Sequence, residues 1–322
     1  MTYLRPWLFG VLISLPLTSA GAADCTLKKV ATFDAKVESG ALLITAKIDG
    51  RDVPVTLDTG SPYNLIDTKL VSELNLPITQ SSHFAAAVDA AGRTIQKIAT
   101  AHTVDLGVSK TTNTPFLIGG EASTRLRTDA LFGTSFLEAN DLELDLAHGK
   151  VNIFLSDHCP GRGVYWAREY VPIPIRVQKD TGHIFLPVAL DGFETIALLD
   201  TGAGLSVVDK RLAEGKLDVP TGGGKDKPDG NMVAGSGATI PYYKHTFGTF
   251  DIGGLAFRNA ELAVMRNRLH HANDDVMSAH ITLQDETPVD APIILGLPHI
   301  AKLRMYFSFK ENMLYVTPAN AQ

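Results

Sequence analysis

Two aspartates in this chain each begin the same tripeptide, Asp-Thr-Gly, directly after a hydrophobic run. The tripeptides are Asp58-Thr59-Gly60 and Asp200-Thr201-Gly202. One copy would say little, because Asp, Thr and Gly are common turn residues. Two copies in matching surroundings would bring two carboxyl groups to one place. Such a pair can supply the base that activates water and the acid that protonates a leaving group, which is the chemistry of amide hydrolysis without a metal.

The surroundings of the two tripeptides match over a long stretch. The aspartates are 200 − 58 = 142 positions apart, and residues 41–67 align with residues 183–209 at that offset without a gap. Asp49-Gly50 then falls on Asp191-Gly192. A repeat of this kind constrains the whole fold, so we expect two similar units.

The two halves also resemble each other further along the chain. The glycine-containing stretch 88–93 resembles 233–238, and the triplet Leu131-Phe132-Gly133 resembles Ile294-Leu295-Gly296. Each triplet is followed by alternating hydrophobic residues around a turn, a pattern typical of a β-hairpin. The order of these features is the same in both halves.

Strand-like stretches dominate the sequence, and the expected helices are few and short. One pair would begin after Asp67 and Asp209, each a plausible N-cap, and a second pair is expected at 134–140 and 297–303. The predicted fold class is therefore all-β, with two similar lobes in one chain.

Two carboxyls a few ångströms apart cannot both ionise freely, so Asp58 and Asp200 would share a proton as a pair. Gly60 and Gly202 allow a tight turn and close backbone approach beside them. The Thr59 and Thr201 hydroxyls can form hydrogen bonds with the opposite loop.

The residue after each tripeptide differs between the halves. Ser61 has a hydroxyl able to donate to the Asp58 carboxylate, whereas Ala203 cannot do the same for its own aspartate. The sequence thus predicts two similar but chemically unequal halves, and it leaves open which aspartate carries the proton.

Both halves resemble the retropepsin-like unit of the aspartic peptidases. The whole chain resembles a bacterial two-lobed aspartic protease, in which duplication replaces the homodimer of the retroviral enzymes. The resemblance covers nearly all of residues 26–318 and rests on the paired Leu-Asp-Thr-Gly motifs and the two triplets. It implies a pseudo-twofold axis, an active-site cleft between the lobes, and triplets that each pack against their own Asp-Thr-Gly loop.

The function that this resemblance implies is an aspartic endopeptidase with Asp58 and Asp200 as catalytic residues. It would need no cofactor or metal and would work as a monomer on a peptide or protein substrate in an extended conformation. Two glycine-containing loops would serve as flaps over that substrate, formed by Val88, Asp89, Ala90, Ala91 and Gly92 in the first half and by Val233, Ala234, Gly235, Ser236 and Gly237 in the second. Unlike the pepsin flap, the first of these carries no tyrosine.

Other functions remain open at this stage. The fold could bind peptides with little or no cutting, or process a single dedicated partner. The aspartates could also be turn caps of an ordinary β-protein. No Gly-x-Ser-x-Gly or His-Glu-x-x-His motif supports a serine hydrolase or a zinc protease. A formal charge of −6 with scattered Lys and Arg argues against nucleic acid as a partner.

The N-terminal 23 residues have the features of a signal peptide: Arg5, an apolar run over 7–17, and small residues over 18–23. A retained membrane anchor is the alternative, although the apolar run is short for a spanning helix. We therefore expect an exported protein, periplasmic or secreted. The lobes would span 24–160 and 177–322, with a junction at 161–176.

The chain has two cysteines, Cys25 and Cys159. In an oxidising compartment we expect them to form a disulfide that ties the mature N-terminus to the junction between the halves. A metal or redox site at Asp157-His158-Cys159 is the alternative, but no CxxC or second histidine at ligand spacing supports it.

Overall fold

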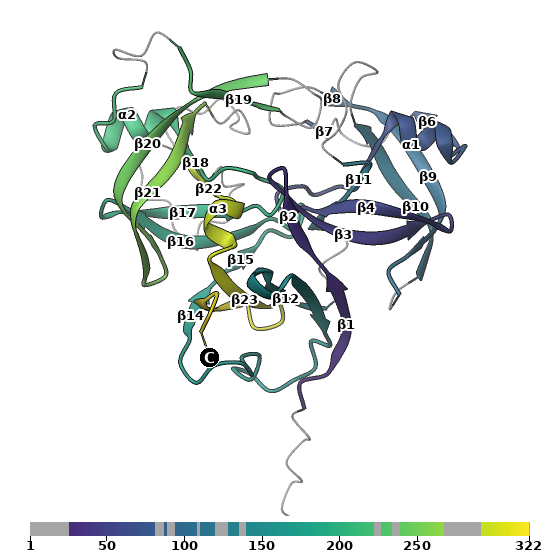
Figure 1. Cartoon of the computed structure of the whole chain (residues 1–322), viewed down its shortest axis with the longest axis horizontal. Helices are drawn as coiled ribbons and strands as arrows, with labels where there is room; N and C mark the ends of the chain where they lie inside the picture. The colour runs from purple at the N-terminus through teal and green to yellow at the C-terminus, as the bar shows by residue number, and fades with distance from the viewer. Residues whose placement is uncertain are drawn as a thin grey trace, which may run out of the picture.

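Three large β-sheets carry most of the described chain: one eight-stranded sheet in each half and a six-stranded sheet that joins the halves (Figure 1). A computed structural model describes residues 26–80, 87–88, 94–107, 110–119, 128–134, 140–221, 227–233, 239–266 and 291–321. The predicted all-β, two-lobed fold is confirmed.

The eight-stranded sheets have the same internal order. In the first lobe the strands run β2 (Lys36–Glu38), β3 (Ala41–Ile48), β4 (Arg51–Leu57), β11 (Ala130–Phe132), β5 (Leu65–Asp67), β10 (Lys110–Gly119), β9 (Lys97–Asp105) and β6 (Ile78–Gln80). In the second they run β15 (Arg176–Val177), β16 (Ile184–Leu190), β17 (Phe193–Leu199), β22 (Ile293–Leu295), β18 (Val207–Asp209), β21 (Leu255–Met265), β20 (Thr239–Ile252) and β19 (Gly230–Val233). The first seven strands of each sheet therefore correspond one to one.

The turns that join β3 to β4 and β16 to β17 repeat at the level of single atoms. Asp49 and Asp191 both have φ +47°, and the glycine after each has φ +81°. The Asp49 carboxylate accepts from the Thr103 N–H at 2.6 Å, and the Asp191 carboxylate accepts from the Thr249 N–H at 2.7 Å. The gapless alignment of the two halves thus corresponds to a true structural repeat.

The helices are short, as expected. Helix α1 (Thr68–Glu73) and helix α2 (Lys210–Lys216) begin after Asp67 and Asp209, whose side chains accept hydrogen bonds from N–H groups in the first turn. The prediction of these two N-caps is confirmed. Helix α3 (Leu297–Ile300) follows the second triplet. Its expected counterpart at 134–140 lies mostly outside the described residues.

The six-stranded sheet is built from both halves. Its order is β1 (Lys29–Asp34), β13 (Lys150–Phe154), β12 (Asp141–Asp145), β23 (Leu303–Ser308), β24 (Met313–Pro318) and β14 (Val171–Pro174). The predicted hairpins are β12–β13, whose turn contains the short 3-10 helix η2 (Leu146–His148), and β23–β24. Strands β12 and β23 pair with each other, so the two halves share one continuous sheet.

Strand β12 buries charged groups as well as leucines. Asp141 and Glu143 have no exposed surface. Glu143 is paired with Arg304 from the other half, whose Nε and Nη2 donate at 2.8 and 2.6 Å. The Arg304 guanidinium also stacks 4.3 Å from the Trp166 ring centre. The junction between the halves is thus held by a buried ion pair, which is stable because each charge has several partners.

The two expected flaps begin as antiparallel hairpins. In the first half β7 (Ala87–Val88) pairs with β8 (Thr94–Ile95), and in the second β19 pairs with the start of β20, with Val233 opposite Thr239. Figure 1 shows both hairpins on the side of the molecule away from the six-stranded sheet. The tips that hold the remaining flap residues, 89–93 and 234–238, lie outside the described residues.

Cys159 is disulfide-bonded, and Cys25 is the only other cysteine in the chain. Cys25 itself lies outside the described residues, as does the expected signal peptide. A sulfur in a disulfide is not a thiolate ligand, so the alternative of a metal site at Asp157-His158-Cys159 loses its cysteine. Within the described ranges, no helix combines the length and apolar character that crossing a membrane requires.

Candidate active site between the lobes

Asp58 and Asp200 lie just beyond the ends of β4 and β17, where each strand meets the triplet of its own half. The Asp58 N–H donates to the Phe132 carbonyl at 2.9 Å, and the Asp200 N–H donates to the Leu295 carbonyl at the same distance. The expectation that each triplet packs against its own Asp-Thr-Gly loop is confirmed.

The last residue of each triplet must be glycine. A Cβ on Gly133 would lie 2.4 Å from the Ser61 carbonyl, and one on Gly296 would lie 2.2 Å from the Leu205 carbonyl. Real Cβ atoms do not approach a backbone oxygen so closely, so any side chain would push the loop away from the triplet. The two glycines thus allow each triplet to pack directly against the backbone that follows its own aspartate.

The N–H of each triplet glycine is held by a side chain from the Asp-Thr-Gly loop. Gly133 donates to Asn64 Oδ1 at 3.1 Å, and Gly296 donates to Ser206 Oγ at 3.0 Å. Sequence reasoning missed these two residues. The signal was present, because they occupy equivalent positions at the 142-residue offset and both can accept a hydrogen bond.

Reciprocal threonine bonds tie the two loops together. Thr201 Oγ1 accepts from the Thr59 N–H at 3.1 Å and donates to the Leu57 carbonyl at 2.7 Å. Thr59 Oγ1 accepts from the Thr201 N–H at 3.1 Å and donates to the Leu199 carbonyl at 2.7 Å. Both threonines are 1% exposed. The prediction that these hydroxyls reach the opposite loop is confirmed, and the equal distances show a local twofold axis.

Each carboxyl is held by its own loop and packed against the other loop. The Gly60 and Gly202 N–H groups donate to Oδ1 of Asp58 and Asp200, both at 2.8 Å. A Cβ on Gly60 would lie 2.3 Å from the Asp200 carboxyl carbon, and a Cβ on Gly202 would lie 2.3 Å from that of Asp58. The structure therefore brings the two predicted carboxyls together, and only glycine fits between them.

The two carboxyls are hydrogen-bonded to each other and titrate as a pair. Removal from bulk water raises the pKa of Asp58 well above its ordinary value, and the nearby charge of Asp200 raises it further. Removal from water also raises the pKa of Asp200, although the hydrogen bonds from Asp58 and the Gly202 N–H oppose the rise. One proton therefore stays on the pair at pH values where an ordinary aspartate has lost it.

The predicted bond from the Ser61 hydroxyl to Asp58 is wrong. Ser61 Oγ donates to the Tyr63 carbonyl at 2.8 Å, a local bond two residues along the same turn. It is the Ser61 backbone N–H that interacts with the Asp58 carboxylate, and the Ala203 N–H does the same for Asp200. Serine and alanine thus serve their aspartates alike, through the backbone.

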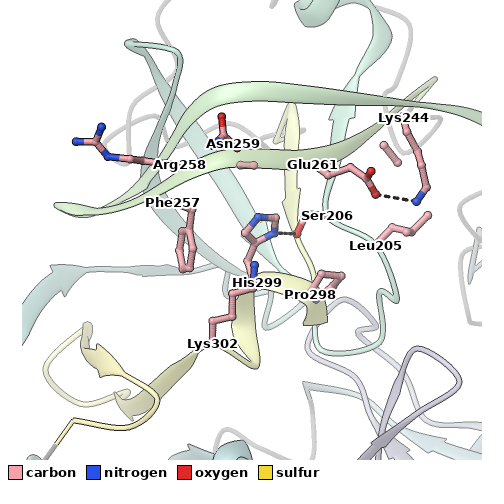
Figure 2. A pocket seen from close by; sticks show the side chains of 12 residues that line it. Leu205, Ser206, Lys244, Phe257, Arg258, Asn259, Glu261, Pro298, His299 and Lys302 are labelled. Atoms are coloured by element: carbon pink, nitrogen blue, oxygen red, sulfur yellow. Dashed lines mark hydrogen bonds and ion pairs between the residues drawn. The ribbon is translucent and has the colours of Figure 1, made fainter.

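A separate cavity of about 220 Å³ lies in the second lobe, away from the two aspartates. Figure 2 shows Ser206 and His299 side by side in it, with Ser206 Oγ hydrogen-bonded to His299 Nδ1 at 2.8 Å. Burial and the Lys302 charge lower the pKa of His299 to about 4, so its ring is neutral. This pair is not a nucleophile and base, because Ser206 is 2% exposed and already accepts from the Gly296 N–H.

Comparison with known families agrees with this geometry. Residues 44–139 match a family described as "gag-polyprotein putative aspartyl protease", and residues 186–298 match a family described as "Aspartyl protease". The first match contains Asp58 and the second contains Asp200. The chain carries two aspartyl protease domains in tandem. A comparison with curated protein sequences found no significant match.

Solved structures extend the likeness of the paired aspartyl protease domains over most of the chain. An aspartic proteinase from Irpex lacteus is 11% identical with a TM-score of 0.50, and the alignment covers 90% of this chain and 97% of the proteinase. Conglutin gamma, a basic 7S globulin from lupine seeds, is also 11% identical with a TM-score of 0.50, covering 92% and 96%. At such identity the likeness shows the fold alone. The two matches include both a proteinase and a seed globulin, so the fold by itself does not decide whether a member cuts peptides.

Proposed function

We propose that this protein is an aspartic endopeptidase, in which Asp58 and Asp200 activate a water molecule for attack on a peptide bond. The observation that supports this best is that each carboxyl packs against the glycine of the opposite loop. A Cβ added to Gly60 or Gly202 would lie only 2.3 Å from the carboxyl carbon of the aspartate across the axis. A turn cap in an ordinary β-protein needs no such partner. The raised pKa values of the pair supply the shared proton that the reaction requires.

The reaction uses the two carboxyls in opposite roles. The ionised aspartate takes a proton from water as the oxygen attacks the carbonyl carbon, and the protonated aspartate gives its proton to the carbonyl oxygen. The tetrahedral diol then collapses: one of its hydroxyls gives its proton to the ionised aspartate as the carbon–nitrogen bond breaks, and the amine leaves with the proton that the other aspartate took from water. At the end of the cycle the pair again holds one proton, so the residues are regenerated without a cofactor.

The proposed substrate is an extended peptide segment that lies between the aspartates and the two hairpins, β7–β8 and β19–β20. Exposed strand edges bind extended peptides through main-chain hydrogen bonds, which suits a substrate held mostly by its backbone. We further propose an exported protein that acts as a monomer, on the basis of the N-terminal signal-like segment and the presence of both halves in one chain.

Cleavage of a peptide library by the purified protein tests the proposal. Asp58→Asn and Asp200→Asn should each lower the cleavage rate by about 100-fold or more, because each removes one proton-transfer group. Asp52→Asn is the matched control, since Asp52 is exposed and paired with Lys47. Pepstatin adds a second readout: inhibition favours a pepsin-like site, and resistance with retained aspartate dependence favours a retropepsin-like one. Equal inertness of wild type and variants would count against a peptidase and favour a peptide-binding protein.

A further inference from the structure

One segment of the second half reaches across to the first half beneath the active loops. His183 Nε2 lies 3.1 Å from the Gly60 carbonyl oxygen, and Thr134 Oγ1 donates to the Thr181 carbonyl at 2.6 Å. A carbonyl oxygen can only accept, so the His183 ring carries its proton on Nε2. The His183 side chain is largely buried and meets the Phe185 ring edge to face. The imidazole is therefore fixed on both sides.

Gly60 contacts both carboxyls, as Gly202 does on the other side of the axis. Its N–H donates to Asp58 at 2.8 Å, and its Cα faces the carboxyl of Asp200. Its carbonyl belongs to the peptide unit whose N–H is that of Ser61, and this N–H interacts with the Asp58 carboxylate. The contacts thus form a chain from the His183 ring, through the Gly60–Ser61 peptide, to Asp58. Hydrogen bonds in such a chain polarise and strengthen one another.

The position in the first half that corresponds to His183 has no side chain that could donate in this way. At the 142-residue offset His183 corresponds to Ala41, which is buried and has no donor on its side chain. Thr134, directly after the first triplet, corresponds to Leu297 after the second, and the leucine side chain has no donor. The backbone bonds do match: the Thr134 N–H donates to the Ser61 carbonyl at 2.8 Å, and the Leu297 N–H donates to the Ala203 carbonyl at 2.9 Å. The backbone of the site is symmetric, and the side-chain support of one loop is not.

The charge state of His183 fits a neutral donor. Burial lowers the pKa of His183, while the Gly60 carbonyl and the charge of Asp200 oppose this. Asp200 is the charged group that acts on the His183 ring. Arg176 stacks on Phe185, the aromatic neighbour of His183, with its guanidinium 5.1 Å from the centre of the Phe185 ring. Burial thus favours the neutral imidazole, and its Nε2–H can donate to the Gly60 carbonyl.

We propose that His183 is a positioning residue that fixes the Gly60–Ser61 peptide and so holds the Asp58 carboxyl at its working position. The inference rests on the proposed peptidase function for its kinetic consequence and on the described hydrogen bonds for its structural one. It adds to the reaction a residue from the second half that acts on the aspartate of the first half.

Two substitutions separate the hydrogen bond from the volume of the ring. His183→Leu removes the donor, and His183→Gln keeps an N–H donor at similar reach. We expect the leucine variant to lower kcat by about 10- to 100-fold with KM within about twofold, because a misplaced catalytic group costs rate more than binding. The glutamine variant should recover most of kcat. His102→Leu is the matched control, since the His102 side chain is 70% exposed on strand β9 and contacts Asp49 rather than the active loops.

Amide hydrogen exchange at Gly60 and Ser61, followed by NMR, provides a readout that does not need activity. Exchange should be about tenfold faster in the leucine variant and near the wild-type rate in the glutamine variant, because a lost bond lets the loop open locally. If the leucine variant does not fold, His183→Phe, which keeps a ring and loses the donor, replaces it.

The outcomes distinguish this inference from the proposed function. An active, aspartate-dependent wild type with a leucine variant equal to His102→Leu would overturn the role of His183 and leave the peptidase intact. Equal impairment of the leucine and glutamine variants would show that packing, and not the hydrogen bond, matters. If the wild type is inert, the peptidase proposal fails, and the exchange rates alone decide whether His183 positions the Gly60–Ser61 peptide. Faster amide exchange in the leucine variant than in the glutamine variant supports that role, and equal rates refute it.

Discussion

The reciprocal threonine bonds give a quantitative prediction for the junction of the two lobes. Thr201→Val keeps the shape of the side chain and removes its hydroxyl. Two buried bonds disappear, one from the Thr59 N–H and one to the Leu57 carbonyl. The surroundings cannot supply water in place of the hydroxyl without opening, because Thr59 and Thr201 are each 1% exposed.

The expected cost follows from the groups left without a partner. A buried donor or acceptor that loses its partner costs about 1–3 kcal/mol, so two such groups lower the free energy of unfolding by about 2–6 kcal/mol. Thr59→Val removes two bonds of the same lengths, 3.1 and 2.7 Å, on the other side of the axis. The two substitutions should therefore destabilise the protein by amounts equal within about 1 kcal/mol, the usual scatter of a single hydrogen bond.

Urea-induced unfolding followed by tryptophan fluorescence and circular dichroism measures these costs, with intact mass checked to exclude self-cleavage. Thr195→Val is the matched control. Thr195 is 7% exposed in β17, and its hydroxyl makes no hydrogen bond to any residue that the structure describes. It should change the free energy of unfolding by less than about 0.5 kcal/mol. A Thr201→Val variant as stable as this control would refute the reasoning, as would costs that differ several-fold between the two motif threonines.

Three further predictions concern other parts of the site and its support. Gly60→Ala should abolish cleavage while the protein stays folded, because its Cβ would meet the Asp200 carboxyl at 2.3 Å; kinetics and circular dichroism check this. Burial alone would lower the pKa of His158, but its bonds to the Cys159 carbonyl and to buried Asp141 raise it instead. Protonated His158 therefore stabilises the folded protein fully below the ordinary pKa of histidine, and this stabilisation is lost as pH rises through the raised pKa of the folded state. Urea midpoints of unfolding should fall as pH rises in the wild type and change less in His158→Gln. Cys159→Ser should lower the free energy of unfolding by about 2–4 kcal/mol relative to the disulfide-bonded wild type, because the unfolded chain loses its crosslink; the reduced wild type should be destabilised to a similar extent.

The fold and the centre of the site could be predicted because the sequence repeats them. The match between residues 41–67 and 183–209 indicated which strands are equivalent, and the hydrophobic-hydrophobic-Gly triplets indicated the segments that pack against the two Asp-Thr-Gly loops. These features depend on backbone geometry that few residue types satisfy. A glycine pressed against a carbonyl, such as Gly133 or Gly296, leaves a clear trace in a sequence.

The side-chain partners could not be predicted in the same way. Ser61 had two possible acceptors within its own turn, and the sequence does not say which carbonyl or carboxylate lies closer. Strand β12 alternates leucine with acidic residues as a half-exposed strand would, yet Asp141 and Glu143 are both buried. Some of their partners come from the other half of the chain: Arg304, which pairs with Glu143, is 161 positions away. Contacts of that kind depend on the assembled fold.

The difference between His183 and Ala41 shows what a duplicated chain can do that a homodimer of identical halves cannot. In a homodimer every side chain appears on both sides of the axis, so any group that supports one aspartate must support the other equally. In a single chain the two copies can change independently while the threonine bonds, at matching 3.1 and 2.7 Å distances, keep the backbone symmetric. One imidazole beneath one loop then makes the two carboxyls unequal without disturbing their spacing. Since the reaction needs one aspartate ionised and the other protonated, an unequal environment favours a single arrangement of the proton over two equivalent ones.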